Sequence, residues 1–307
     1  MQSLPTVVDM TPTTPAHPAQ PAAHGHHHER PGHGDRPGHG PAPENDTDLA
    51  ELLDLDAQHA APVLAAALDA AAAALGHAPR EVVDLGAGTG TGTLALAARF
   101  SGARVHALDA SAGMIERIRA SAALSGLSER IETHLVDLDT DWPAAVPHEV
   151  DMAWAALSLH HTSDPSRVLR QVFDVLRPGG VVVATEFSGA TTYSPADLGT
   201  GSSDLGGRVV SALATRGYPV TAEWTEALVA AGFSDVSRHE ATVAVSSRTA
   251  AGARFLELQL QRNRELLGDE LGADDLAGLD AAIAGLGAGA SSVDHTSGRV
   301  FWVAVRP

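Results

Sequence analysis

The fold is decided by the stretch VVDLGAGTGTG, residues 82–92. Its two leading valines are β-branched and indicate the end of a buried strand. Four glycines follow at positions 86 to 92, and an Ala/Leu-rich helical pattern then runs from Thr93 to Phe100. A strand, a glycine-rich turn and a helix in this order bring the backbone close to a nucleotide-type ligand.

Two acidic residues select among such ligands. Asp84 lies two positions before the first glycine, and Asp109 directly follows the next strand pattern, residues 104–108. This pair suits S-adenosylmethionine, because Asp84 can organise the turn and face the ligand's ammonium group, directly or through water. Asp109 can accept two hydrogen bonds from the ribose hydroxyls. Glycines 86, 88 and 90 let the backbone pass the amino acid part of the ligand without a Cβ clash.

A dinucleotide site is the alternative for the same loop. A G-x-G-x-x-G pattern that starts at Gly86 requires glycine at position 91, where this chain has Thr91. A pattern that starts at Gly88 fails at Thr93 for the same reason. NAD(P) is therefore the runner-up cofactor.

The chain resembles the class I S-adenosylmethionine-dependent methyltransferases of the small-molecule type, over roughly residues 48–307. In chain order, the motifs that carry the resemblance are VVDLGAGTGTGTLALA (82–97), VHALDAS (105–111) with Gly113-Met114, IETHLVDLDTDWP (131–143), VDMAWAALSLHH (150–161) and LRQVFDVLRPGGVVVATEF (169–187). The resemblance implies S-adenosylmethionine as the cofactor. In the third motif an acidic residue commonly holds the adenine amino group; here Asp137 is favoured and Asp139 competes with it. The cofactor-binding residues predicted in this way are Asp84, Gly86, Ala87, Gly88, Gly90, Asp109, Ala110, Met114, Asp137, Leu138 and Ala155.

Strand and helix patterns alternate from residue 81 to residue 187. This alternation predicts an α/β fold with a doubly wound, mostly parallel sheet, whose ligands bind at the carboxyl ends of the strands. The resemblance implies seven strands in a Rossmann-like methyltransferase fold, with a final antiparallel hairpin and helical cap insertions at about 189–220 and 248–292. A helix is predicted over 221–231 with Thr221 as its N-cap, and the last strand is predicted over 300–305.

Residues 1–46 are rich in His, Pro and Gly and have almost no large apolar residues. Such a segment cannot bury enough surface to offset its ordering entropy, so the sequence predicts a disordered tail before a methyltransferase domain at 47–307. The tail contains His24, His26, His27 and His28, a histidine-rich tract that can bind divalent metals. Both a metal-handling function and incidental affinity fit this tract. No metal site is predicted within the domain.

Composition excludes several classes of chemistry. The chain has no cysteine and no lysine, which excludes disulfides, thiolate metal sites, cysteine nucleophiles and Schiff bases. A net charge of −18 repels phosphate backbones, so nucleic acid is not an expected partner. Neither a membrane span nor a signal peptide is predicted, and the expected location is cytoplasmic. The expected partner is a small-molecule methyl acceptor, and a homodimer is left open.

Candidate catalytic residues follow the fourth strand pattern. His160 and His161 lie where the transferred methyl group would point, and an imidazole is a suitable general base for a hydroxyl acceptor. The competing interpretation is that His160 packs against the cofactor or caps the next helix. Glu186, Tyr193, Tyr218 and Trp224 are further candidates for contact with the acceptor. The same fold without methyl transfer, as a binding protein for the cofactor, is the alternative function.

Overall fold

The structure is a computed structural model, and it describes residues 46–307. The predicted tail and its histidine tract at residues 24–28 lie outside the described residues. The first helix begins at Asp46, next to the domain boundary predicted from composition.

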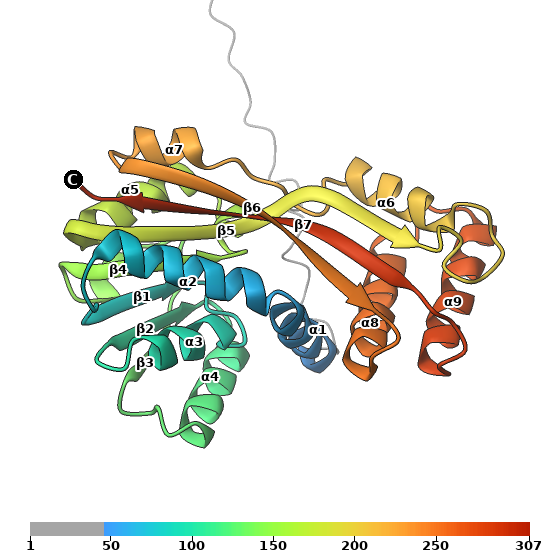
Figure 1. Cartoon of the computed structure of the whole chain (residues 1–307), viewed down its shortest axis with the longest axis horizontal. Coiled ribbons are helices and arrows are strands. Elements are labelled where there is room, and N and C mark those ends of the chain that lie inside the picture. The colour runs from blue at the N-terminus through green and yellow to red at the C-terminus, as the bar shows by residue number, and fades with distance from the viewer. Residues whose placement is uncertain (1–45) are drawn as a thin grey trace, which may run out of the picture. The chain divides into compact units, whose positions relative to one another are not determined.

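The core of the fold is a seven-stranded sheet with the order β3-β2-β1-β4-β5-β7-β6, drawn in Figure 1. All of its pairs are parallel except those that β7 makes with β5 and β6. The prediction of a doubly wound, mostly parallel sheet is confirmed. The strands are β1 (Glu81–Leu85), β2 (Arg104–Asp109), β3 (Ile131–Leu135), β4 (Val150–Ala156), β5 (Leu176–Ser194), β6 (Ser234–Ser246) and β7 (Asp294–Val305).

Helices cover both faces of this sheet, because side chains alternate between the faces along each strand. Val82 and Val105 pack in one core with helices α2, α3 and α4, whereas Val83 and Leu108 pack in a second core with α5 and α7. The helices and 3₁₀ turns of the described residues are α1 (Asp46–His59), α2 (Ala61–Leu75), α3 (Thr91–Arg99), α4 (Ala112–Leu124), η1 (Trp142–Ala145), η2 (Leu159–His161), α5 (Pro165–Val175), α6 (Leu205–Thr215), α7 (Thr225–Ala230), α8 (Ala250–Leu266) and α9 (Ala273–Gly287).

Local capping residues explain where several helices begin. Ser111 accepts a hydrogen bond from the Met114 amide and starts α4, and Asp164 does the same for α5 from the Arg167 amide. Helix α3 differs, because it begins after Gly90 without a side-chain cap. Its first N–H groups are therefore left to whatever binds at the glycine loop.

Strands β5, β6 and β7 continue past the ends of β1 to β4, and α6, α8 and α9 gather at that distal end (Figure 1). We call these three helices with the distal strand ends the cap. Strand β7 begins at Asp294, six residues before the predicted start at residue 300, because it pairs with the extended part of β5. The residues between β6 and β7 form two helices, as the helical pattern of that region predicts.

One helix prediction is wrong at its start. Helix α7 begins at Thr225 after Trp224, and Thr221 does not cap it. Thr221 instead forms a bridge with Phe187, next to the end of the parallel part of the sheet. The tertiary pairing has overridden the local capping signal.

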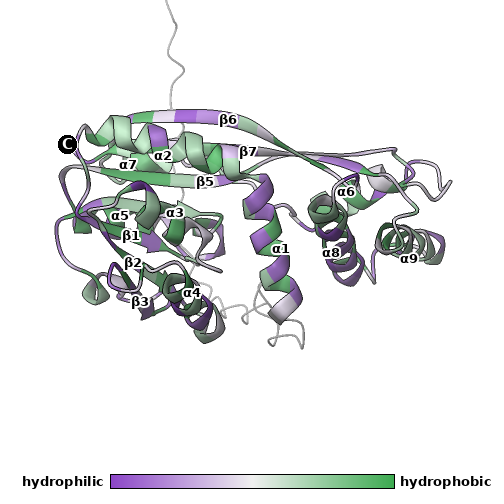
Figure 2. Cartoon of the chain, turned by 60° about the horizontal axis from the view of Figure 1, so that its bottom comes forward, coloured by the Kyte–Doolittle hydropathy of each residue, from purple (hydrophilic) through white to green (hydrophobic). Residues whose placement is uncertain are grey.

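Among the described residues no single helix is long and apolar enough to cross a membrane. Helices α1 and α2 pass the length and composition test only as a pair, bent by 65°. Figure 2 shows α1 with alternating hydrophilic and hydrophobic residues, whereas several residues of α2 are buried in the core.

Candidate cofactor and active site

The glycine loop between β1 and α3 contains glycines that serve two different purposes. Gly86 and Gly90 have positive φ angles, and a Cβ there would lie 2.5 Å from Ser158 Cβ and 2.8 Å from Ile118 Cγ1 respectively. Gly88 also has a positive φ, but a Cβ there would meet nothing within 4 Å. The internal packing of the loop therefore requires glycine at 86 and 90, whereas Gly88 faces open space where a ligand can approach closely.

Asp84 organises this loop from within the core. Its carboxylate is buried and accepts a 2.6 Å hydrogen bond from Thr93 Oγ1, which joins the end of β1 to the first turn of α3. Burial raises the pKa of Asp84 to about 7, against the opposing hydrogen bond from Thr93. A cation bound at the loop would favour the ionised carboxylate, which fits the expected interaction with an ammonium group.

Asp109 lies beside Gly88 at the end of β2. One carboxylate oxygen accepts a 2.8 Å hydrogen bond from the Gly88 amide, and the other accepts one of the same length from the Ser111 amide. Burial raises the pKa of Asp109, and these backbone hydrogen bonds oppose the rise. Each carboxylate oxygen retains a lone pair, so the side chain can also accept hydrogen bonds from a diol.

The structure separates Asp137 from its competitor Asp139. Asp139 accepts hydrogen bonds from the amide and hydroxyl of Ser163, so it holds the loop before α5. Asp137 is exposed after β3, and its carboxylate accepts a hydrogen bond from the Asp139 amide. Asp137 is thus the better placed of the two to meet a ligand.

The other predicted cofactor-binding residues differ in how far their side chains are exposed to solvent. Ala87 is half-buried and Ala110 is exposed, and they flank the Gly88–Asp109 hydrogen bond in sequence. Met114 lies in the first turn of α4 and is largely buried, while the side chains of Leu138 and Ala155 lie in the second core. Leu138 and Ala155 can therefore reach a ligand mainly through their backbone.

A buried acid–base pair lies just past the end of β4, at the point where β5 stops pairing with β4 and continues toward the cap. His160 Nδ1 is 2.6 Å from Glu186 Oε2, and the two side chains are 7% and 1% exposed. Trp224 Nε1 donates a 3.3 Å hydrogen bond to the other oxygen of Glu186. His161 is exposed, and its ring centroid lies 4.1 Å from that of His160. Of the two predicted catalytic histidines, His160 is oriented by Glu186.

Helix α1 connects the parts of the molecule that surround this region. Asp54 pairs with Arg117 of α4 at 2.7 Å, and Glu51 pairs with Arg254 of α8 at 2.8 Å. Asp56 pairs at 2.6 Å with Arg299 of β7, whose guanidinium lies over the ring of Phe187, the residue after Glu186. The helix thus joins the cofactor half of the sheet to the cap.

Comparison with known proteins places the glycine loop in a family. Residues 82–180 match the family described as a methyltransferase domain. The chain is 37% identical over 106 residues to trans-aconitate 2-methyltransferase of Methylobacterium radiotolerans, covering 34% of this chain and 37% of that protein. It is also 37% identical over 111 residues to demethylmenaquinone methyltransferase of Clavibacter sepedonicus, covering 36% and 42% respectively.

Residues 82–180 form a methyltransferase domain of the class I S-adenosylmethionine-dependent type. The cofactor of this family is S-adenosylmethionine, the ligand favoured by the Asp84–Asp109 pair, and NAD(P) is set aside. The aligned stretch spans about two-fifths of the length of these curated relatives. A putative methyltransferase structure from Bacillus halodurans C-125 shares the fold, with a TM-score of 0.50 and 15% identity over 80% of this chain and 98% of that chain.

Three contacts of this methyltransferase were not predicted from its sequence. Ser158 donates a 2.6 Å hydrogen bond to the Leu85 carbonyl and fills the space that Gly86 leaves. Thr93 pairs with Asp84, and Trp224 pairs with Glu186. Ser158 could have been noticed as a polar residue at a strand end, but the partner of Trp224 is 38 residues away and no local pattern connects them.

Proposed function

We propose that the protein transfers the methyl group of S-adenosylmethionine to a hydroxyl oxygen of a small molecule, and that His160 is the general base. The observation that carries the proposal is the 2.6 Å contact between His160 Nδ1 and Glu186 Oε2, just past the carboxyl end of β4 and at the point where β5 stops pairing with it. Ligands of doubly wound sheets bind at these strand ends. A base is needed when the accepting atom carries a proton at neutral pH.

When bound, S-adenosylmethionine would supply a methyl group attached to a positively charged sulfur. On transfer the carbon–sulfur bond would break, and the sulfur would leave as a neutral thioether. The acceptor oxygen forms the new bond to the methyl carbon, and its proton passes to Nε2 of His160. Glu186 accepts the Nδ1–H of His160, so it fixes the tautomer that keeps a lone pair on Nε2 and stabilises the imidazolium that forms. The protein's main contribution is alignment of the two reactants, with proton removal as the second.

The small size of the acceptor is supported by charge and by the relatives. The net charge of −18 is unfavourable for a nucleic acid substrate. Two relatives are named for trans-aconitate and demethylmenaquinone, which are small organic acceptors. The cap lies outside the family match at residues 82–180, so we assign the choice of acceptor to it.

The test is an acceptor screen with the full chain and S-adenosylmethionine, read by mass spectrometry for products heavier by one methyl group. On the best acceptor, His160→Ala is expected to lower kcat by about 10²–10⁴-fold, the usual contribution of a general base. Glu186→Gln should lower kcat with little change in KM, because it acts through the orientation of His160. His161→Ala, which removes the exposed neighbour, should cost less than about tenfold.

The alternative functions give different results in the same experiment. A protein that binds the cofactor without transfer would bind it in calorimetry and yield no methylated product from any acceptor. Equal losses for the His160 and His161 variants would contradict the role of Glu186. A metal-handling function of the histidine tract would predict that alanine at positions 24, 26, 27 and 28 abolishes that function. The methyl-transfer proposal predicts that the same substitutions leave methyl transfer unchanged.

A further inference from the structure

Four polar side chains meet on one face of β1, β2 and β3, away from the cofactor loop. In the register of the sheet, His106 of β2 pairs with Glu132 of β3, and His134 follows two residues later on the same face. Glu81 of β1 contacts His106 from the other side. Helices α3 and α4, which contact β2 and β3, pack with Val105 and Ile131 on the opposite face. The packing of α3 and α4 therefore does not explain the polar side chains on the first face.

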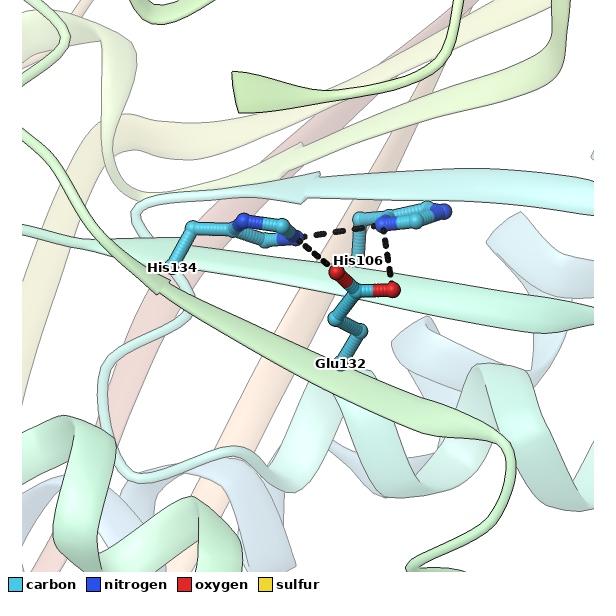
Figure 3. Close-up of side chains that lie close together, drawn as sticks. All are labelled: His106, Glu132 and His134. Atoms are coloured by element: carbon cyan, nitrogen blue, oxygen red, sulfur yellow. Dashed lines mark hydrogen bonds and ion pairs between the residues drawn. The ribbon is translucent and has the colours of Figure 1, made fainter.

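Figure 3 shows the two imidazole rings directed toward each other, with the Glu132 carboxylate next to both. His106 Nδ1 lies 3.1 Å from His134 Nε2, and the Glu132 oxygens lie 3.7 Å and 3.9 Å from these two nitrogens. Zinc binds such ligands at about 2.0–2.2 Å, which places neighbouring tetrahedral ligand atoms about 3.3–3.5 Å apart. The two Glu132 distances are to different oxygens, Oε2 and Oε1, and one ligand atom from each of the three residues lies within 4.8 Å of the others. An ion bound by both nitrogens and one of these oxygens therefore needs side-chain shifts on the order of 0.5–1 Å.

Glu81 provides the second observation. Its Oε2 lies 2.9 Å from His106 Nε2, the ring nitrogen that does not face the cluster. A carboxylate in this position accepts the Nε2–H and fixes the tautomer whose lone pair on Nδ1 is directed at the other two ligands. Metal-binding histidines commonly have such an outer carboxylate, which orients the ring and raises its basicity.

Burial divides the cluster into a fixed part and an accessible part. The side chains of His106 and His134 are 3% and 14% exposed, whereas Glu132 is 50% exposed. The two imidazoles are thus held in place by their surroundings, and the carboxylate opens toward solvent. This arrangement gives an ion a path of entry and leaves a coordination position for water.

We propose that His106, Glu132 and His134 bind one divalent transition metal ion, zinc in the first place, with Glu81 as the outer partner of His106. Two imidazoles and one carboxylate suit zinc and its neighbours in the first transition row. His106 lies three residues before Asp109 on β2, about 10 Å along the strand. The ion would tie the edge strand β3 to β2 and so support the strand ends that carry Asp109 and Asp137. We expect a role in stability and not in methyl transfer.

The experiment uses the full chain with all seven histidines of residues 1–45 changed to alanine, so that the tail contributes no imidazole. These are His17, His24, His26, His27, His28, His33 and His39. Zinc binding is measured by competition with a chromophoric chelator, and cobalt binding by its visible absorption, which is strong for four-coordinate sites. The parent is expected to bind one ion per chain and to unfold at a higher temperature with zinc.

In this background His134→Ala and Glu132→Gln should each weaken zinc binding by at least about tenfold and abolish the thermal shift. Glu81→Gln should weaken it by about 10–100-fold, the usual effect of an outer partner. His148→Ala removes an exposed histidine outside the cluster and should change neither measurement. Glu132 is half exposed, so its variant tests the site even if the loss of His134 disturbs folding. Equal zinc affinity in the parent and the Glu132→Gln protein, or no binding in the parent, would overturn the proposal.

Discussion

Asp84 and Asp109 in the cofactor half and His295 in the cap are buried ionisable groups whose surroundings treat them in opposite ways. Around the glycine loop, Asp84 accepts a hydrogen bond from Thr93 of α3, and Asp109 accepts hydrogen bonds from the amides of Gly88 and Ser111. In the cap, His295 is 2% exposed, and neither of its ring nitrogens has a hydrogen-bond partner among the described residues. The buried Oε1 of Gln259 on α8 likewise has none.

This difference separates two kinds of site within one fold. In the cofactor half, Asp84 and Asp109 find their hydrogen-bond partners within 21 residues or fewer. The cap is assembled from distant segments: His295 lies against Tyr193 and Phe255, and Asn263 donates to the Tyr193 hydroxyl. We therefore expect substitutions in the cofactor half to affect cofactor binding, and substitutions in the cap to affect which acceptor reacts.

The largest expected effect is a difference in the free energy of unfolding between alanine variants of two glycines in the same loop. Gly86→Ala should lower the free energy of unfolding by about 3 kcal/mol or more, because a left-handed backbone and a clash with Ser158 add together. Gly88→Ala should lower it by only about 1–2 kcal/mol, since its Cβ meets no protein atom. Urea unfolding measures both values.

Cofactor affinity then sharpens the contrast between these two variants. Gly88→Ala should remain folded and lose at least about tenfold in affinity for S-adenosylmethionine, because the methyl group occupies space that the ligand needs. Unchanged affinity in the folded Gly88→Ala protein would show that this open side of the loop is not the ligand side.

Asp84 should make the cofactor half more stable in mild acid. Burial raises its pKa in the folded state to about 7, above the ordinary value of 3.8, so the folded state binds the extra proton between these values. The free energy of unfolding of the unliganded protein should therefore gain about 3 kcal/mol from this residue as the pH falls from 8 to 5. Asp84→Asn should remove that gain in urea unfolding at the two pH values. An identical pH dependence in both proteins would contradict it.

His295 should make the protein less stable as the pH falls, which is the opposite of the effect of Asp84. Burial, with a smaller contribution from Arg299, lowers its pKa to about 4 from the ordinary 6.5. The folded state therefore binds fewer protons than the unfolded state, and stability that is complete above pH 6.5 is lost as the pH falls. His295→Phe should retain about 2 kcal/mol more of its pH 7.5 stability at pH 4.5 than the parent does. The same loss in both proteins would remove His295 as the cause.

The smallest expected effect concerns the helix between the two regions. Arg117 and Asp54 form an ion pair whose side chains are 44% and 41% exposed, so Asp54→Ala should change the free energy of unfolding by less than about 1 kcal/mol. If α1 closes over the bound cofactor, the same variant should speed cofactor dissociation in stopped-flow measurements. A stability loss well above this range would mean that the pair holds α1 in place.

The features that the sequence predicted and those that it did not follow the same division between local contacts and contacts of distant segments. The glycine spacing, the strand patterns and the acidic residues at strand ends are local signals, and they predicted the sheet and the positions of Asp84 and Asp109. The pairing of Trp224 with Glu186, the start of α7 and the early start of β7 depend on contacts between distant segments. Thr221 has the side chain of a helix cap, yet its bridge to Phe187 decides its role. The cluster of His106, Glu132 and His134 likewise appears only when β2 and β3 pair.

The most direct test of the cofactor site is calorimetric titration of the full chain and of Asp109→Ala with S-adenosylmethionine. Asp269→Ala, which removes an exposed acidic residue between α8 and α9, serves as the control. Loss of two charge-assisted hydrogen bonds to the ribose should weaken binding by about a hundredfold or more in the Asp109 variant and leave the control unchanged. Undiminished affinity in a folded Asp109→Ala protein would contradict the placement of the cofactor between the glycine loop and the end of β2.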